Sequence, residues 1–271
     1  MPLSNGTYYF ANEENNWARP AVILLHGAGG NHLFWPPEIR HLAGQRIYAL
    51  DLPSHGKSEG VGRQSISDYA ESVLDFMDSL KMRKAVFVGH SMGGAIALWL
   101  GIHRPARTLG LGLVATAPRL RVSPELLENA SNPATARLSA RGEACPLVVK
   151  TIVEWSFSPS ADARLKELAA KRLSEVRSSV LHGDFLACAA YDETNLLGRI
   201  KAPTLIISGS EDKMTPPYLS QAMRERIKNS LLHTVDGAGH MVMLEQPLVV
   251  ARVLDLFLNT IDYRPGESIN P

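Results

Sequence analysis

Short apolar runs, rich in branched side chains, recur along the chain and are separated by stretches whose apolar positions follow a helical spacing. A continuous apolar run of about five residues is typical of a strand that a parallel sheet buries on both faces. Six such runs are found, at 21–25, 46–50, 85–89, 109–114, 203–208 and 231–235. Because these runs alternate with helical segments, the pattern predicts an α/β fold built of βαβ units around a mostly parallel sheet.

Two of the stretches outside the strands predict helices with one apolar face. Residues 66–80 carry apolar side chains at every third or fourth position, and Ser65 or Ser67 is available to cap the start of that helix. Residues 247–261 repeat the pattern behind Pro247, a residue that is favoured in the first turn of a helix.

The alternation stops between about Arg119 and about His182, where helical patterns follow one another without a strand-like run. The helical segments predicted there are 123–130, 133–141, 146–156 and 161–178. No low-complexity linker separates this stretch from its surroundings, so we expect it to pack on the main domain. The predicted organisation is a core domain of residues 1–118 and 183–271, with a helical insertion at 119–182.

The composition narrows the class of protein. The 271 residues are enough for one large α/β domain that carries an inserted lobe. Lysine and arginine number 28 against 27 aspartates and glutamates, which leaves a net charge of +1, and the basic residues are scattered. That balance argues against nucleic acid and anionic membranes as partners and favours a small neutral molecule. The only two cysteines, Cys145 and Cys188, are expected to be free thiols without a catalytic role.

The pattern predicts neither a targeting signal nor a membrane span. Residues 1–17 lack a basic stretch followed by an apolar one, and no apolar run approaches the length of a membrane span. We therefore expect a cytoplasmic protein. No close pairing of histidines of the kind that binds zinc occurs, and the glycine-rich segment at 26–32 lacks the spacing of a dinucleotide site. The sequence thus gives no reason to expect a metal or an organic cofactor.

A candidate nucleophile lies where strand 85–89 meets the helix-like stretch 95–100, in the sequence GHSMGG. A sharp turn at this point would expose the Ser91 hydroxyl and aim a helix N-terminus at any developing negative charge. Gly89 and Gly93, two residues on either side, remove Cβ atoms that would collide at so close an approach of strand and helix. A G-x-S-x-G string also arises by chance, so its strand-turn-helix context carries the inference.

A serine hydroxyl needs a base, and a histidine base works best when a carboxylate fixes its tautomer. In open α/β sheets these groups lie on loops at the carboxyl ends of strands. His240 follows the last candidate strand across a glycine-rich turn, and Asp212 and its neighbour Glu211 follow the strand before it. We choose Asp212 as the acid, which gives the order Ser91, Asp212, His240 that is typical of this architecture.

Acyl transfer also needs N–H donors for the negatively charged oxygen of the intermediate. Met92 supplies one backbone N–H at the start of the helix, and Ala28, in the glycine-rich turn after the first long strand, is the best candidate for the second. His26 and Asp51 also stand at strand ends, but they precede the serine. We expect His26 to make structural hydrogen bonds and Asp51 to organise its own loop.

Apolar side chains near these loops are candidates for the wall of a substrate pocket. They are Phe34, Trp35, Trp155, Phe157, Met214 and Met241, with Phe185 as a further candidate. The two methionines stand next to the proposed acid and base. Aromatic residues at such spacing also occur as ordinary core residues, so both interpretations stay open here.

Taken together, these segments resemble the α/β-hydrolase family over nearly the whole chain. The matching segments, in order, are LLHGAGG at 24–30, DLPSHGKS at 51–58, GHSMGG at 89–94, SGSEDKMTPP at 208–217 and GAGH at 237–240. The resemblance implies an eight-stranded, mostly parallel sheet flanked by helices, with the insertion forming a cap over the serine. Ser54 replaces a glycine of the family pattern, outside the chemistry. Ser91 argues against the branches that use an aspartate nucleophile, the haloalkane dehalogenases and epoxide hydrolases.

The expected function is that of a serine hydrolase, which cleaves carboxylic esters of small, largely apolar substrates through an acyl-enzyme intermediate. The alternative enzyme is a carbon–carbon bond hydrolase or an enol-lactonase that acts on ring-cleavage products and binds an anionic substrate. The basic residues available for such an anion are Arg119, Arg121, Arg137, Arg141 and Lys150. A ligand receptor that keeps the fold without turnover is the alternative from another class. The acyl chain, the alcohol and the oligomeric state stay open.

Overall fold

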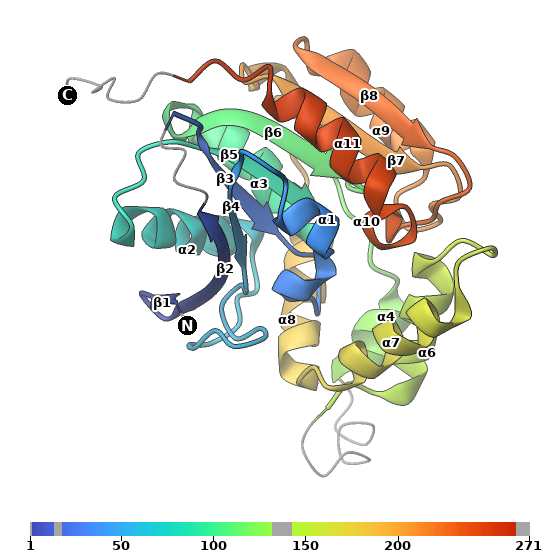
Figure 1. Ribbon diagram of the computed structural model, residues 1–271. Helices are drawn as coiled ribbons and strands as arrows, with labels where there is room; N and C mark the ends of the chain where they lie inside the picture. The colour runs from blue at the N-terminus through green and yellow to red at the C-terminus, as the bar shows by residue number, and fades with distance from the viewer. Residues whose placement is uncertain (1, 14–17, 132–142, 264–271) are drawn as a thin grey trace.

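The computed structural model describes residues 2–13, 18–131 and 143–263. Its centre is an eight-stranded sheet with the strand order β1-β2-β4-β3-β5-β6-β7-β8 (Figure 1). The strands are β1 (Leu3–Ser4), β2 (Thr7–Glu13), β3 (Ala21–Leu25), β4 (Arg46–Leu50), β5 (Ala85–His90), β6 (Thr108–Val114), β7 (Thr204–Gly209) and β8 (Ser230–Val235). β2 pairs antiparallel with β1 and β4, and all other pairings are parallel.

All six apolar runs form strands, so the predicted mostly parallel sheet is confirmed. The two strands that no apolar run predicts are β1 and β2. β1 has only 2 residues, and β2 alternates between buried and half-buried positions near the edge of the sheet. Neither therefore has the continuous apolar run that marks a strand buried on both faces.

Helices cover both faces of the sheet. They are α1 (Pro37–Arg40), α2 (Ile66–Ser79), α3 (Met92–His103), α4 (Pro124–Ser131), α6 (Pro146–Ser156), α7 (Ala163–Ser174), α8 (Ser178–Ala190), α9 (Pro217–Arg226), α10 (Val242–Glu245) and α11 (Pro247–Leu258). In Figure 1, α1 and α11 lie on one face, and α2 and α3 lie on the other. Neighbouring residues of a strand pack on opposite faces of the sheet. Phe87 belongs to the same hydrophobic cluster as Leu98 of α3, and Val86 belongs to the other cluster, with Leu254 of α11.

The helices predicted outside the insertion are present. The side chain of Ser65 caps α2 by accepting a hydrogen bond from the Asp68 N–H at 3.1 Å. α11 begins at Pro247 as expected but ends at Leu258, short of the predicted residue 261. None of the helices in the described part of the chain is long and apolar enough to cross a bilayer.

α4, α6 and α7 form a group of their own outside the two helical layers (Figure 1). Together with α8 they enclose a third hydrophobic cluster, which includes Val148, Leu173 and Leu181. α8 then packs against α3 of the main domain. Residues of α6 and α7 line one cavity together with His90 at the end of β5 and His240 in the loop after β8, so the group lies over the carboxyl edge of the sheet.

The helices between residues 123 and 190 differ from the prediction at two points. Segments 123–130 and 146–156 correspond to α4 and α6, whereas segment 133–141 lies outside the described residues. Segment 161–178 was predicted as one helix, which is wrong, because α7 ends at Ser174 and the chain leaves the helical path before Arg177. The helix that follows, α8, was missed because its outward side carries apolar residues such as Leu186 and Ala189, while its buried side includes Asp184, so the sequence shows no clear apolar face.

Candidate active site

Ser91 occupies the turn between β5 and α3, where its backbone is strained. Its φ of 53° and ψ of −116° lie in a region that residues other than glycine rarely adopt. Three hydrogen bonds hold this conformation: the Ser91 N–H donates to Val114 O at 3.0 Å, and the Ser91 carbonyl accepts from Ala95 N at 3.0 Å and from Thr116 Oγ1 at 2.8 Å. Strand and helix together therefore fix the position of the serine side chain.

Glycines around Ser91 allow the strands and the helix to approach closely. A Cβ atom on Gly89 would overlap the backbone of Gly93, and a Cβ atom on Gly93 would overlap the carbonyl group of Leu25 in β3. These neighbours are backbone atoms, which cannot move aside without displacing α3 or the sheet. The GHSMGG sequence is thus required by the local geometry of this turn.

The structure brings Asp212 and His240 together in the interior. Asp212 Oδ2 lies 2.9 Å from His240 Nδ1, and the side chains are 0% and 3% exposed, respectively. Asp212 Oδ1 accepts hydrogen bonds from the N–H groups of Met214 and Thr215, both at 2.8 Å. Burial acts to raise the pKa of Asp212, but His240 and these hydrogen bonds outweigh burial and lower the pKa below its ordinary value. Glu211 is exposed, so Asp212 is the carboxylate that reaches the histidine.

Ser91 and His240 line the same small cavity, which has a volume of about 70 Å³. Because Asp212 accepts the proton of His240 Nδ1, the other nitrogen, Nε2, keeps a free lone pair. His240 Nε2 is buried and has no hydrogen-bond partner among the residues described. A histidine with a free lone pair in a cavity that also exposes a serine hydroxyl is suited to act as a general base.

Both proposed oxyanion donors lie at this site. Ala28 lines the cavity, and Met92 is the first residue of α3, immediately after Ser91. Within the described part of the chain, neither of their N–H groups donates a hydrogen bond to the backbone. A free N–H at a helix N-terminus and a free N–H in the facing turn are suited to bind a negatively charged oxygen.

Four of the six predicted pocket residues line the cavity at Ser91, namely Phe34, Phe157, Met214 and Met241. Phe185, the further candidate, lines it as well. The rest of the wall includes residues that the sequence did not single out: Ile152, Val153, Ala169 and Leu173. They belong to the apolar sides of α6 and α7, where spacing alone does not distinguish a pocket wall from a core.

The two tryptophans do not line the small cavity at Ser91. Trp35 is fully buried in the hydrophobic layer beneath α1 and α11, so it is a core residue. The reason is local: successive residues of the loop project in different directions, and Phe34 takes the side that faces the cavity. Trp155 is 41% exposed and lines a second, larger cavity.

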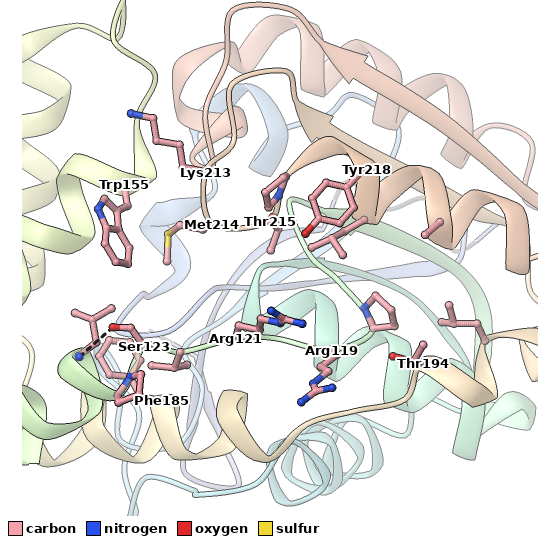
Figure 2. Close-up of a pocket in the computed structure, with 18 of the residues that line it drawn as sticks. Arg119, Arg121, Ser123, Trp155, Phe185, Thr194, Lys213, Met214, Thr215 and Tyr218 are labelled. Carbon is pink, nitrogen blue, oxygen red and sulfur yellow. Dashed lines mark hydrogen bonds between the residues drawn. The ribbon is translucent and has the colours of Figure 1, made fainter.

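The larger cavity has a volume of about 700 Å³ and shares Phe185 and Met214 with the cavity at Ser91 (Figure 2). Figure 2 shows Trp155 of α6 and Phe185 of α8 on one side of the cavity and Tyr218 of α9 on the other. The two cavities are therefore adjacent.

A buried polar network supports the glycine-rich loop after β3. The carboxylate of Asp184, on α8, accepts hydrogen bonds from the Gly29 N–H at 2.8 Å, from Tyr69 Oη at 2.5 Å and from His55 Nε2 at 2.8 Å. His55 Nδ1 in turn lies 3.0 Å from the carbonyl oxygen of Pro53. Because both nitrogens face acceptors, His55 is a buried cation. Burial lowers the pKa of His55, but Asp184 outweighs burial and raises it above the ordinary value.

His26 makes structural hydrogen bonds, in line with the expectation from sequence. Its Nδ1–H donates to the Gly27 carbonyl at 2.8 Å, and its Nε2 accepts from the Leu52 N–H at 3.0 Å. This pairing requires a neutral ring. Burial and the charged His55, whose ring centroid is 4.9 Å away, lower the pKa of His26 to about 4.

Asp51 organises its own loop. Its Oδ1 accepts hydrogen bonds from the backbone N–H of His32 at 2.7 Å and from His32 Nδ1 at 2.8 Å, and its Oδ2 accepts from the Lys57 N–H at 2.8 Å. Burial opposes the ionised form, but these hydrogen bonds prevail and lower the pKa of Asp51. The carboxylate thus ties the loop after β4 to the loop after β3.

The titration of His26 alone is expected to lower the free energy of unfolding by about 3 kcal/mol as the pH falls from about 6.5 to about 4. The unfolded chain binds a proton at His26 near pH 6.5, whereas the folded chain resists protonation down to about 4. The contribution is therefore complete above pH 6.5 and is lost as the pH falls. Urea unfolding across this range measures the slope, and His26→Gln should make it shallower. An equal slope in wild type and His26→Gln contradicts the assignment.

Both cysteines are free, as predicted, and the structure buries both. Burial and the nearby Asp184 raise the pKa of the Cys188 thiol, which makes it a poor nucleophile. Across the described residues, no group of three histidines, cysteines or carboxylates is arranged to hold a metal ion.

Comparisons with known proteins identify the family. Residues 22–253 match the model of the alpha/beta hydrolase family. The chain is 31% identical to 3-oxoadipate enol-lactonase 1 of Acinetobacter baylyi over 246 residues, which are 89% of this chain and 90% of that protein. The protein therefore belongs to the α/β-hydrolase family.

Solved structures show the same fold. The enol-lactonase from Burkholderia xenovorans LB400 superposes with a TM-score of 0.84 at 23% identity, covering 94% of this chain and 98% of that chain. A thermophilic esterase superposes with a TM-score of 0.78 at 32% identity, covering 94% of each chain. The predicted fold, an eight-stranded and mostly parallel sheet flanked by helices, is thus confirmed.

Proposed function

We propose that the protein is a serine hydrolase that cleaves carboxylic esters of small, largely apolar substrates. The observation that carries this proposal is the buried Asp212–His240 pair, at 2.9 Å, beside a cavity that Ser91 also lines. Relatives that are named as an enol-lactonase and an esterase support the same class of reaction.

The first half of the reaction forms an acyl-enzyme. Ser91 Oγ attacks the ester carbonyl carbon while His240 Nε2 takes the hydroxyl proton, and Asp212 stabilises the imidazolium that results. The N–H groups of Ala28 and Met92 hold the negatively charged oxygen of the tetrahedral intermediate. When the intermediate collapses, the bond to the alcohol breaks and His240 gives its proton to the leaving oxygen.

The second half releases the acid. A water molecule in the place of the alcohol gives a proton to His240 Nε2 and attacks the acyl carbon. Collapse of the second intermediate breaks the bond to Ser91 Oγ, which recovers its proton from His240. The cycle uses the three side chains, the two backbone N–H groups and one water molecule for each ester.

The size of the cavities supports a small substrate. A volume of about 70 Å³ at Ser91 leaves room for a short acyl group, and the adjacent cavity of about 700 Å³ has room for the remainder. We assign the covering helices to a cap at residues 119–182, inserted in a core of residues 1–118 and 183–271. Two buried free thiols support placing the enzyme in the reducing cytoplasm.

A lactone is the second candidate substrate. The observation that favours it is the 31% identity to a protein named 3-oxoadipate enol-lactonase. A lactone is a cyclic ester, so the same two steps open it, with the leaving alcohol still attached to the acyl group.

Covalent labelling tests the proposal. A fluorophosphonate probe is expected to label Ser91, as peptide mass spectrometry can show, and a panel of short esters, lactones and dienoates should reveal turnover of esters or lactones. Turnover of dienoates alone would indicate a carbon–carbon bond hydrolase. Absence of both labelling and turnover would contradict the proposal and indicate a ligand receptor with this fold.

A further inference from the structure

The charged residues found in the lining of the larger cavity are all basic. Its lining includes Arg119, Arg121, Lys213 and Arg226, whereas no aspartate or glutamate is found among the described residues that line it. The whole chain has 28 basic and 27 acidic residues, so a purely basic lining departs from the composition. Figure 2 shows Arg119 and Arg121 close together in the cavity, on the segment that follows β6.

Among the three arginines of this lining, Arg121 is the one without an ion pair or hydrogen bond to the described residues. Arg119 lies 3.6 Å from the carboxylate of a neighbouring aspartate, and Arg226 donates to a backbone carbonyl at 3.1 Å. In Figure 2 the ammonium group of Lys213 points away from the two arginines. Arg121 makes no ion pair or hydrogen bond with any other residue that the structure describes. Its guanidinium group therefore keeps its donors free.

We propose that the larger cavity binds a carboxylate of the substrate and that Arg121 is the residue that pairs with it. A planar guanidinium offers two parallel N–H donors that match the two oxygens of a carboxylate. Apolar residues such as Val122 and Leu219 line the same cavity and suit a short hydrocarbon chain. The inference rests on the proposed function and narrows it to small esters or lactones that carry a free carboxylate.

The two cavities also determine which half of the ester carries the charge. The cavity of about 70 Å³ at Ser91 holds a short acyl group, so a longer and charged part extends into the larger cavity. Phe185 and Met214 line both cavities, so the two cavities lie next to each other. The carboxylate therefore belongs to the alcohol half of an open-chain ester.

Lysine and arginine residues elsewhere on the cap have other surroundings. Lys150, one of the cations considered from the sequence, is 72% exposed and lies 3.8 Å from Glu154 on the same helix. Arg137 and Arg141 lie outside the described residues. Of the cap and near-cap cations in the described chain, Arg121 combines a place in the cavity with free donors.

Acetate esters of ω-hydroxy acids and of the matching neutral amides test the charge preference at equal size. We expect the wild type to hydrolyse the anionic esters with a kcat/KM about tenfold above that of the amides. Arg121→Gln should remove the preference by raising KM for the anionic esters about tenfold, with kcat and the neutral esters little changed. Added salt should raise KM for the anionic esters of the wild type only.

Arg164→Gln is the matched control, since it removes the same charge from an exposed arginine on α7. Equal KM values for charged and neutral esters in the wild type would overturn the inference while leaving ester hydrolysis intact. An equal loss in Arg121→Gln and Arg164→Gln would do the same. If no ester is turned over, the proposed function fails, and calorimetric titration with glutarate still tests the cavity: binding that Arg121→Gln abolishes supports the site, and no binding overturns it.

Discussion

Replacement of Ser91 by alanine is expected to lower kcat for ester hydrolysis by about 10⁶, the loss that removal of a nucleophilic serine causes in serine hydrolases. The substitution deletes one oxygen atom. Without it, His240 has no hydroxyl proton to accept and no covalent intermediate forms, although the N–H groups of Ala28 and Met92 can still bind a carbonyl oxygen. Single-turnover hydrolysis of a short p-nitrophenyl ester measures this loss.

The fold should survive this change, because the φ of 53° at residue 91 is imposed by hydrogen bonds from strand and helix and not by the serine side chain. We therefore expect the thermal midpoint to move by less than about 2 °C. Ser67→Ala is the control and should retain full activity, because Ser67 lies on α2, which does not line the cavity at Ser91. Activity of Ser91→Ala within tenfold of the wild type would exclude Ser91 as the nucleophile.

The parallel sheet could be predicted because each of its buried strands can be recognised from its own short stretch of sequence. β3, β4 and β5 are buried at every position, so each is a continuous apolar run in the sequence. The turn at Ser91 could be predicted for the same reason, since strand, glycines and helix are consecutive. The pairing of Asp212 with His240 followed from one topological rule, namely that the carboxyl ends of parallel strands share an edge.

Features that depend on contacts distant in sequence could not be predicted. Phe34 and Trp35 are both apolar and adjacent, and only the direction of each side chain separates a cavity wall from a core residue. Asp184 lies in α8, which has no motif and no polar face, yet it contacts both Gly29 and His55. A lone carboxylate in an apolar helix indicates a buried partner, but the sequence does not identify the partner.

Asp184→Asn is expected to destabilise the protein by about 3 kcal/mol, because it breaks a buried ion pair and leaves the His55 cation uncompensated. Asparagine has the same size but no negative charge, so His55 must lose its proton to remain in the interior. The amide can still accept a hydrogen bond from the Gly29 N–H or from Tyr69 Oη, which is why the chain should still fold. Asp75→Asn, at an exposed position on α2, is the matched control and should have no effect.

The pH dependence of the unfolding free energy distinguishes an ion pair between Asp184 and His55 from a hydrogen bond between Asp184 and a neutral His55. Since the folded pKa of His55 is raised, its contribution is complete below about pH 6.5 and is lost as the pH rises through the folded pKa. The difference in unfolding free energy between wild type and Asp184→Asn should therefore be largest near about pH 6 and smaller near about pH 9, as urea titrations can measure. A difference that does not vary with pH would mean that His55 is neutral.

Asp184→Asn should also lower kcat for ester hydrolysis by up to about tenfold. Asp184 holds the N–H of Gly29, which follows Ala28, so its loss leaves the proposed oxyanion donor less firmly held.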